Sequence, residues 1–233
     1  MSAPTAPAEA AEVFGEALGL AQEYAELLAG AGTVRGLIGP REVPRLWERH
    51  LLNCAVVSEL IPQPAAPAGT ATTVCDLGSG AGLPGIPLAI RRPDLQVTLL
   101  EPLLRRVRFL QEAVTSLGLG NVEVHRGRAE ELSGHAVFDV VTSRAVASLD
   151  RLAGWSLPLT ADGGVVLAIK GSSAAEEVAA AHATLGRLGC HDVAVLTAGT
   201  RWLHPPVRVV RMVKDAGPER GRPHGRRALK QRR

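Results

Sequence analysis

Aromatic residues and cysteines are scarce in this sequence, and each shortage narrows what the protein can be. Aromatic side chains make up 3% of the 233 residues and hydrophobic ones 46%, so a core has to be built mainly from Ala, Val and Leu. The three cysteines, Cys54, Cys75 and Cys190, are odd in number and widely spaced, which fits neither a disulfide framework nor a zinc motif. We therefore expect buried, reduced thiols and no metal site.

Signals for secretion or membrane insertion are also missing from the sequence. Residues 1–34 contain no Lys or Arg, whereas a secretory signal begins with a positively charged segment. No apolar run approaches the roughly 20 residues that are needed to span a bilayer. We expect a monomeric, cytoplasmic protein that makes no contact with a membrane.

Charge is distributed unevenly along the chain. Residues 201–233 hold 11 Lys or Arg and two acidic residues, whereas the first 200 residues hold 15 basic and 21 acidic ones. A strongly basic end commonly contacts a polyanion, usually nucleic acid; the alternative is a solvated extension that aids solubility. We expect residues 214–233 to form a basic tail that is disordered without RNA.

The pattern of apolar residues changes near residue 61. Residues 1–60 contain two stretches with helical spacing, 6–30 and about 42–60, and predict a small helical N-terminal region. Residues 61–71 hold three prolines and no charge, which indicates a linker. Residues 72–213 then alternate apolar runs with helical segments, and we predict strands at 72–76, 96–101, 121–125, 137–143, 163–170, 192–197 and 207–213. Such alternation predicts an α/β domain with a mostly parallel seven-stranded sheet and helices on both faces.

The stretch DLGSGAGLPG (76–85) follows the first predicted strand and fits two glycine-rich templates. One is the dinucleotide fingerprint G-x-G-x-x-G, which should begin immediately after the strand. That register begins at Gly80, four residues beyond Asp76, and a start at Gly78 puts Leu83 where the third glycine belongs. The other template, D-x-G-x-G-x-G, is typical of S-adenosylmethionine sites and fits without adjustment.

Charge favours the same choice of cofactor. A carboxylate at Asp76 would repel a pyrophosphate, which prefers backbone N–H groups and a helix N-terminus. The sulfonium and ammonium groups of S-adenosylmethionine are cationic, so the same carboxylate favours them. Glu101, at the end of the second strand, is in position to bind ribose hydroxyls of either cofactor. We predict an S-adenosylmethionine site that includes Gly78, Gly80 and Glu101.

Four motifs in order, RHLLN (49–53), DLGSGAGLPGIPLAI (76–90), RRVRFLQ (105–111) and SRAVASL (143–149), give the chain a family resemblance. It resembles the ribosomal RNA small subunit methyltransferase G family, also called glucose-inhibited division protein B, over roughly half its length. The resemblance implies a Rossmann-like class I S-adenosylmethionine-dependent methyltransferase. It also implies methylation at N7 of guanine 527 in 16S rRNA. The substrate would be either naked 16S rRNA or the small ribosomal subunit.

The resemblance also implies roles for individual residues. The positions that match donor contacts of the family are Gly78, Leu83, Ala129, Glu130 and Arg144. Many members read RHxxDS, whereas this chain has Asn53 and Cys54 at the last two positions.

A methylation at guanine N7 needs no general base, because the neutral base carries a free lone pair there. The enzyme then acts by positioning and electrostatics. Arg144 is the candidate catalytic residue and would bind either guanine O6 or the carboxylate of the donor. We predict that His50 packs between domains and that Lys170 reaches the cleft or the RNA.

Two other functions fit the sequence less well than methyl transfer. An NAD-dependent oxidoreductase would need a proton donor such as a Tyr-x-x-x-Lys pair, yet the only tyrosine is Tyr24, in the N-terminal helical stretch. A non-catalytic RNA-binding protein on a methyltransferase fold would have no need of an intact glycine loop, Glu101 and Arg144.

Overall fold

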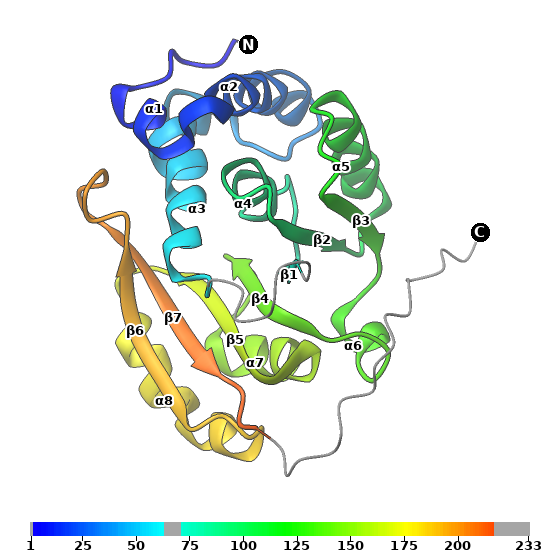
Figure 1. Ribbon diagram of the computed structural model, residues 1–233, viewed down its shortest axis with the longest axis vertical. Helices are drawn as coiled ribbons and strands as arrows, with labels where there is room; N and C mark the ends of the chain where they lie inside the picture. The colour runs from blue at the N-terminus through cyan, green and yellow to red at the C-terminus, as the bar shows by residue number, and fades with distance from the viewer. Residues whose placement is uncertain (1, 63–70, 217–233) are drawn as a thin grey trace.

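A seven-stranded β-sheet forms the centre of the molecule. The computed structural model describes residues 2–62 and 71–216 (Figure 1). The strands lie in the order β3-β2-β1-β4-β5-β7-β6; β7 runs antiparallel to β5 and β6, and the other pairings are parallel. They are β1 (Thr72–Leu77), β2 (Leu95–Glu101), β3 (Val122–Arg126), β4 (Phe138–Arg144), β5 (Thr160–Lys170), β6 (Asp192–Ala198) and β7 (Val207–Val213). Every predicted strand is confirmed, with its ends displaced by a few residues at most.

Helices cover both faces of the sheet, as predicted (Figure 1). They are α4 (Gly85–Arg91), α5 (Leu104–Ser116), α6 (Ala129–Leu132), α7 (Leu149–Ser156) and α8 (Ala174–Arg187). Residues 165–169 of β5 are all buried because side chains on both of its faces are covered. Leu167 and Ile169 pack in the cluster that includes α4 and α5, whereas Val166 and Ala168 pack in the cluster of α6, α7 and α8. Helix α6 was not predicted, because four residues are too few to display a helical period.

The N-terminal region is helical, but its two predicted helices are broken into shorter pieces. The first becomes α1 (Ala8–Phe14), a 3-10 turn at 15–17, α2 (Leu18–Leu27) and a π-helical turn at 28–32. The second becomes a 3-10 segment at 40–45, a π-helical segment at 46–52, α3 (Asn53–Ala55) and a 3-10 turn at 56–60. Gly15, with a φ of 55°, ends α1, and Pro44 lies inside the 40–45 segment, where it cannot donate a helical hydrogen bond.

The N-terminal helices pack on the sheet as part of one hydrophobic cluster. Tyr24 and Leu51 are fully buried and belong to the same cluster as Val74 of β1 and Leu99 of β2. The loop between β6 and β7 also returns to this region, where the backbone N–H of Gly199 donates to Glu59 at 2.9 Å. The N-terminal region and the sheet therefore share their core on this face.

Two sequence predictions concern the parts of the chain outside the described residues. Most of the predicted linker, 63–70, and most of the basic tail, 217–233, lie there. Lys214 and Asp215, which the prediction assigned to the tail, are hydrogen-bonded to the folded body: Lys214 pairs with Gly163 and Gly164, and Asp215 with Gly189.

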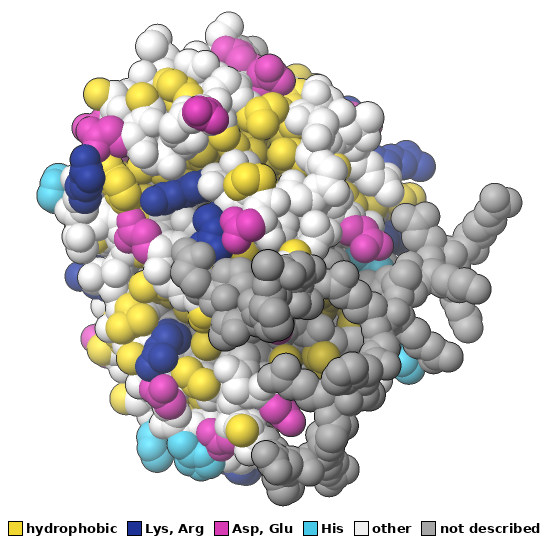
Figure 2. Space-filling model, viewed as in Figure 1, with side chains coloured by type: hydrophobic (Ala, Val, Ile, Leu, Met, Phe, Trp, Pro, Cys, Tyr) yellow, Lys and Arg dark blue, Asp and Glu magenta, His cyan; other side chains and the backbone are white. Residues whose placement is uncertain are grey.

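The surface of the described residues carries charges of both signs. On the face shown in Figure 2, Lys and Arg side chains lie close to Asp and Glu side chains and do not form one continuous field. Within residues 2–62 and 71–216, none of the helices is both long enough and apolar enough to cross a bilayer.

Candidate active site

The glycine loop lies at the carboxyl end of β1, the edge of a parallel sheet where ligands bind. Gly78, Gly80 and Gly82 have φ values of 72°, 61° and 97°, a left-handed conformation that strongly favours glycine. The backbone N–H groups of Gly78 and Ser79 donate to the carbonyl of Leu100 at 2.9 and 3.1 Å, so the loop is tied to the end of β2. The spacing of glycines in the sequence therefore has a direct conformational cause.

Asp76, the last acidic residue before the loop, is fully buried, and only one of its two carboxylate oxygens accepts hydrogen bonds from the described residues. Its Oδ2 accepts hydrogen bonds from the Ser79 hydroxyl at 2.5 Å and from the Gly85 N–H at 2.9 Å. Among the described residues, Oδ1 has no hydrogen-bond partner. Burial raises the pKa of Asp76 to about 6, although Ser79, Gly85 and the charge of Arg144 oppose the shift. A cationic ligand group at Oδ1 would stabilise the ionised carboxylate.

Glu101, at the end of β2, is buried against the same loop. Its Oε2 accepts the Gly80 N–H at 3.0 Å, and its Oε1 accepts the Leu103 N–H at 3.0 Å. Arg106 Nη1 lies 3.5 Å from Oε2. A carboxylate has about four acceptor positions, so Glu101 can hold the loop and still accept hydrogen bonds from ribose hydroxyls.

The other predicted donor contacts lie at the same edge of the sheet. Leu83 is buried within the glycine loop. Ala129 is buried and Glu130 is exposed at the start of α6, which follows β3. The Gly127 N–H donates to the Glu101 carbonyl at 3.3 Å, which joins the turn after β3 to the end of β2. The structure thus brings Gly80 and Glu101 into direct contact and places Ala129 and Glu130 one strand further along.

Tyr24 is a site residue that the sequence analysis missed. Its hydroxyl is fully buried and donates to the Ala81 carbonyl in the glycine loop at 2.7 Å. Burial keeps its pKa well above the ordinary value, so the hydroxyl remains a donor. A Cβ on Gly82 would lie 3.0 Å from the Tyr24 hydroxyl oxygen, so α2 closely covers this loop. In the sequence, the only hint of this role is that the single tyrosine lies in an Ala-rich helix.

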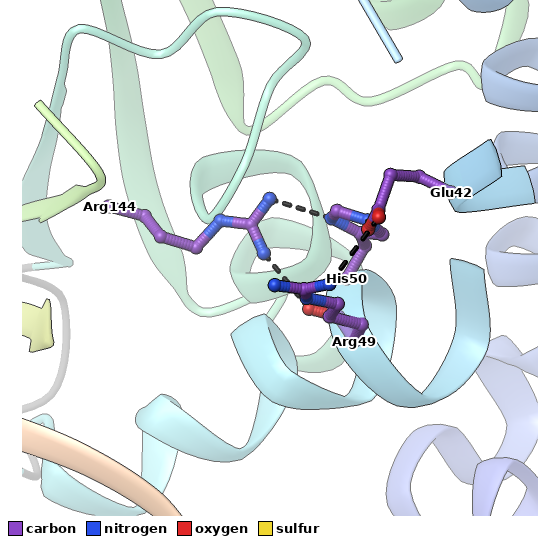
Figure 3. A network of polar contacts seen from close by, with 4 residues as sticks. All are labelled: Glu42, Arg49, His50 and Arg144. Atoms are coloured by element: carbon purple, nitrogen blue, oxygen red, sulfur yellow. Dashed lines mark hydrogen bonds and ion pairs between the residues drawn. The ribbon is translucent and has the colours of Figure 1, made fainter. Parts of the chain in front are cut away.

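Arg144, at the end of β4, is held by the N-terminal region through its guanidinium (Figure 3). Its Nη1 donates to the Arg49 carbonyl at 3.0 Å, and its Nη2 lies 2.7 Å from Nδ1 of His50. The other imidazole nitrogen, Nε2, lies 3.0 Å from Oε2 of Glu42. His50 does lie between the N-terminal helices and the sheet, as predicted, and it also carries this polar contact.

An open cleft of about 420 Å³ lies beside this contact, between the side chains of Arg49 and Asn53 and the ends of β4 and β5. It is lined by Arg49, Asn53, Arg144, Ala145, Ala147, Ile169, Lys170, Gly171 and Glu177. Lys170 does reach this cleft, where its Nζ donates to the Ala147 carbonyl at 2.8 Å and to Glu177 at 2.7 Å.

The loop after β4 connects this cleft with the glycine loop. A Cβ added to Gly78 would lie 3.1 Å from a methyl group of Val146, so Val146 covers that glycine. Ala145 has a φ of 54°, a left-handed conformation that is uncommon for residues other than glycine. Residues 144–147 therefore form one wall that the glycine loop and the cleft share.

The cysteines do not offer a nucleophile. All three are buried free thiols, as expected, and burial raises the pKa of Cys54 to about 11 and that of Cys75 still further. A thiol with a raised pKa is a poor nucleophile near neutral pH. In the described parts of the chain, no group of three or more His, Cys, Asp or Glu side chains is placed to hold a metal ion.

Comparison with known proteins identifies the family. The family model GidB, described as rRNA small subunit methyltransferase G, matches residues 18–204. The chain belongs to this family. It is 56% identical over 216 residues to the ribosomal RNA small subunit methyltransferase G of Streptomyces avermitilis, covering 92% of this chain and 88% of that protein. It is 55% identical over 215 residues to that of Mycobacterium marinum, covering 91% of this chain and 90% of that protein.

Solved structures agree on the fold of this family member. A precorrin-6y C5,15-methyltransferase from Geobacter metallireducens superimposes with a TM-score of 0.50 at 19% identity, covering 76% of this chain and 90% of that one. A SAM-dependent O-methyltransferase from Thermotoga maritima gives a TM-score of 0.51 at 13% identity, covering 72% of this chain and 66% of that one. The fold is the Rossmann-like class I fold of S-adenosylmethionine-dependent methyltransferases.

The cofactor of this methyltransferase is S-adenosylmethionine, and the residues at the glycine loop suit it. Oδ1 of Asp76, which no described residue contacts by a hydrogen bond, offers a buried acceptor for a cationic group, and Glu101 offers acceptor capacity for hydroxyls. The loop 78–85 contains no Lys or Arg that would oppose a cation. The donor set therefore fits a positively charged nucleoside better than a pyrophosphate.

Proposed function

We propose that this protein transfers a methyl group from S-adenosylmethionine to N7 of guanine 527 in 16S rRNA, and that it does so in the cytoplasm. One observation carries the proposal: the loop at Asp76, suited to a cationic donor, shares residues 144–147 as a wall with an open cleft. Such an arrangement would bring the donor and the acceptor base next to each other at residues 144–147.

We infer that each residue of the donor site contacts a different group of the donor. Asp76 holds the ammonium of the donor, Glu101 its ribose hydroxyls, and Gly78 and Gly80 let the backbone approach closely. Bound S-adenosylmethionine supplies a methyl group on a positively charged sulfur. Guanine N7 needs no deprotonation, so the remaining task of the chain is orientation, which alone can contribute several kcal/mol.

The cleft is the place we propose for the acceptor base. Its polar lining includes Asn53 and Arg144, and Arg49 stands at its rim with about half of its side chain exposed. RNA-binding proteins commonly read unstacked bases of single-stranded loops and hold the phosphates with Arg and Lys. The predicted basic tail would add phosphate contacts, whether the substrate is naked rRNA or the small ribosomal subunit.

The test is to map N7-methylguanine in 16S rRNA from cells with and without this protein. We expect the modification at position 527 to disappear with the gene and to return when the gene is restored. Restoration with a Gly78→Val variant serves as the control for a requirement of donor binding. An unchanged modification at 527 in cells that lack the protein would disprove the assignment.

A further inference from the structure

His50 occupies an unusual position between a cation and an anion. It is buried, with 8% of its surface exposed, in the π-helical segment 46–52. Its Nδ1 lies 2.7 Å from Nη2 of Arg144, and its Nε2 lies 3.0 Å from Oε2 of Glu42 (Figure 3). Arg49 Nη1 pairs with the other Glu42 oxygen at 3.3 Å. π-helical turns inside helices often occur at functional sites.

Donor and acceptor chemistry determines the state of the imidazole. A guanidinium has only N–H donors, so the short contact with Arg144 requires a lone pair on Nδ1. The single proton of the neutral ring then resides on Nε2 and is donated to Glu42. If Nδ1 were protonated as well, two cations would face each other and the Arg144 hydrogen bond would be lost.

The charged groups around His50 favour this neutral state. Burial lowers the pKa of His50, and the charges of Arg144 from β4 and of Arg49 from its own segment lower it further. Glu42, from the 40–45 segment, opposes them by its hydrogen bond and its charge. The net shift is downward, so the imidazole is neutral at neutral pH.

We propose that His50 is a positioning residue for Arg144 and that Glu42 fixes the imidazole tautomer which this requires. The inference rests on the proposed function, because Arg144 lines the cleft assigned to the acceptor base. Two of the five N–H groups of the guanidinium are held by His50 and by the Arg49 carbonyl. Within residues 2–62 and 71–216 the other three have no hydrogen-bond partner and could bind a ligand, and the long side chain is fixed before that ligand binds.

A second consequence is a dependence of methyl transfer on pH. Protonation of His50 releases Arg144, so the rate falls in acid with an apparent pKa below the ordinary histidine value. Glu42 raises the pKa of His50, so the loss of its charge moves the acid limb to lower pH. A histidine that only fills space would produce neither effect.

The kinetic test measures single-turnover methylation of 16S rRNA between about pH 4.5 and 8.5, with saturating donor so that titration of Asp76 does not contribute. We expect His50→Leu to lower the rate about ten-fold or more at neutral pH. We expect His50→Asn, whose Oδ1 can accept from Arg144, to recover most of the rate and to lack the acid limb. Glu42→Gln should shift that limb to lower pH. His182→Leu and Glu48→Gln, at exposed positions, serve as matched controls and should behave as the wild type.

A spectroscopic measurement tests the contact without any RNA. Nitrogen NMR of the wild-type protein should show the Nε2–H tautomer for His50, with His50→Asn used to assign its signal. Arg144→Ala should raise the pKa of His50, because a neighbouring cation has been removed. An Nδ1–H tautomer, or a pKa that Arg144→Ala leaves unchanged, would overturn the inference. So would an acid limb that persists in His50→Asn. If the NMR results hold while no RNA is methylated, the proposed function fails and the Arg144–His50 contact stands.

Discussion

The guanidinium of Arg144 is joined to the imidazole of His50 at 2.7 Å, across 94 positions of the sequence. A residue at the end of a central strand is thereby held by the helical region that precedes the sheet. The N-terminal region thus holds Arg144, which we propose orients the reacting groups, in addition to covering one face of the sheet.

Replacement of Arg144 should therefore affect the reaction more than the fold. We expect Arg144→Ala to lower the single-turnover rate by at least about ten-fold, or about 1.4 kcal/mol. Arg144→Lys should restore little, because an ammonium lacks the planar fork that reaches both His50 and the Arg49 carbonyl. Arg187→Ala, at the exposed end of α8, is the control. Single-turnover rates like those of the wild type in Arg144→Ala would make Arg144 a structural residue.

Donor binding should depend on Gly78. We expect wild-type protein to bind S-adenosylmethionine with micromolar affinity, about −7 to −8 kcal/mol. Gly78→Val should abolish binding, because a branched side chain strains a backbone with a φ of 72° and collides with Val146. Gly118→Val is the matched control, since Gly118 has a φ of 62° but open space around its Cβ position. Calorimetry with folded Gly78→Val that still showed wild-type affinity would mean that the site is misplaced.

Asp76 should lower the stability of the free protein at neutral pH. Its pKa is about 6 in the folded state because of burial, against an ordinary value of 3.8, so folding is disfavoured when the carboxyl ionises. The penalty is absent below the unfolded pKa, grows as pH rises from that value to the folded pKa and is complete above it, where it amounts to about 3 kcal/mol.

We expect Asp76→Asn to raise the free energy of unfolding by up to about 3 kcal/mol at pH 8 and by roughly half of that at pH 5. The same variant should bind S-adenosylmethionine more weakly, because the carboxylate that would face its ammonium is gone. Urea unfolding at the two pH values, with the exposed Asp162→Asn as control, measures the first effect. A gain that does not change with pH would rule out ionisation of Asp76 as its cause.

Glu177 should matter for the loop that covers Gly78. Its Oε2 accepts both from Lys170 at 2.7 Å and from the Leu149 N–H at 3.1 Å. Glu177→Ala leaves a largely buried ammonium without its carboxylate, so we expect the free energy of unfolding to fall by about 1–3 kcal/mol. Glu176→Ala, at the exposed neighbouring position on α8, should change stability little, and chemical denaturation compares the two. Equal stabilities would show that the Lys170 pairing contributes nothing.

The basic end should act on RNA affinity alone. Residues 220–233 include seven Lys or Arg, and each phosphate contact releases condensed counterions. Deletion of residues 217–233 should weaken RNA binding and flatten the slope of affinity against salt by several units, with donor affinity and the choice of guanine unchanged. A tail of equal length with Gln at the basic positions should behave like the deletion. Parallel slopes with equal affinities would identify a passive extension.

Local patterns in the sequence were sufficient to predict the strands of the sheet and the identity of the cofactor. The strands of β1 to β7 follow from apolar runs between turn residues, and burial on both faces makes those runs easy to see. The glycines at 78, 80 and 82 predicted a tight loop, and the structure shows why they are needed: each has a positive φ, which few other residues adopt. Asp76 beside them distinguished a cationic donor from a pyrophosphate. Each of these signals depends on residues that are close together in the chain.

Contacts between distant residues required the tertiary structure. The Tyr24 hydroxyl donates to the carbonyl of Ala81, 57 positions away in the sequence. No periodicity or motif in an Ala-rich helix predicts a hydrogen bond to a loop in another part of the fold. The sequence motif RHLLN drew attention to His50, but only the packing of residues 46–52 against the end of β4 pairs it with Arg144. Likewise, Asp76 was recognised from its place in the motif, whereas its raised pKa comes from desolvation, which depends on every element that covers it.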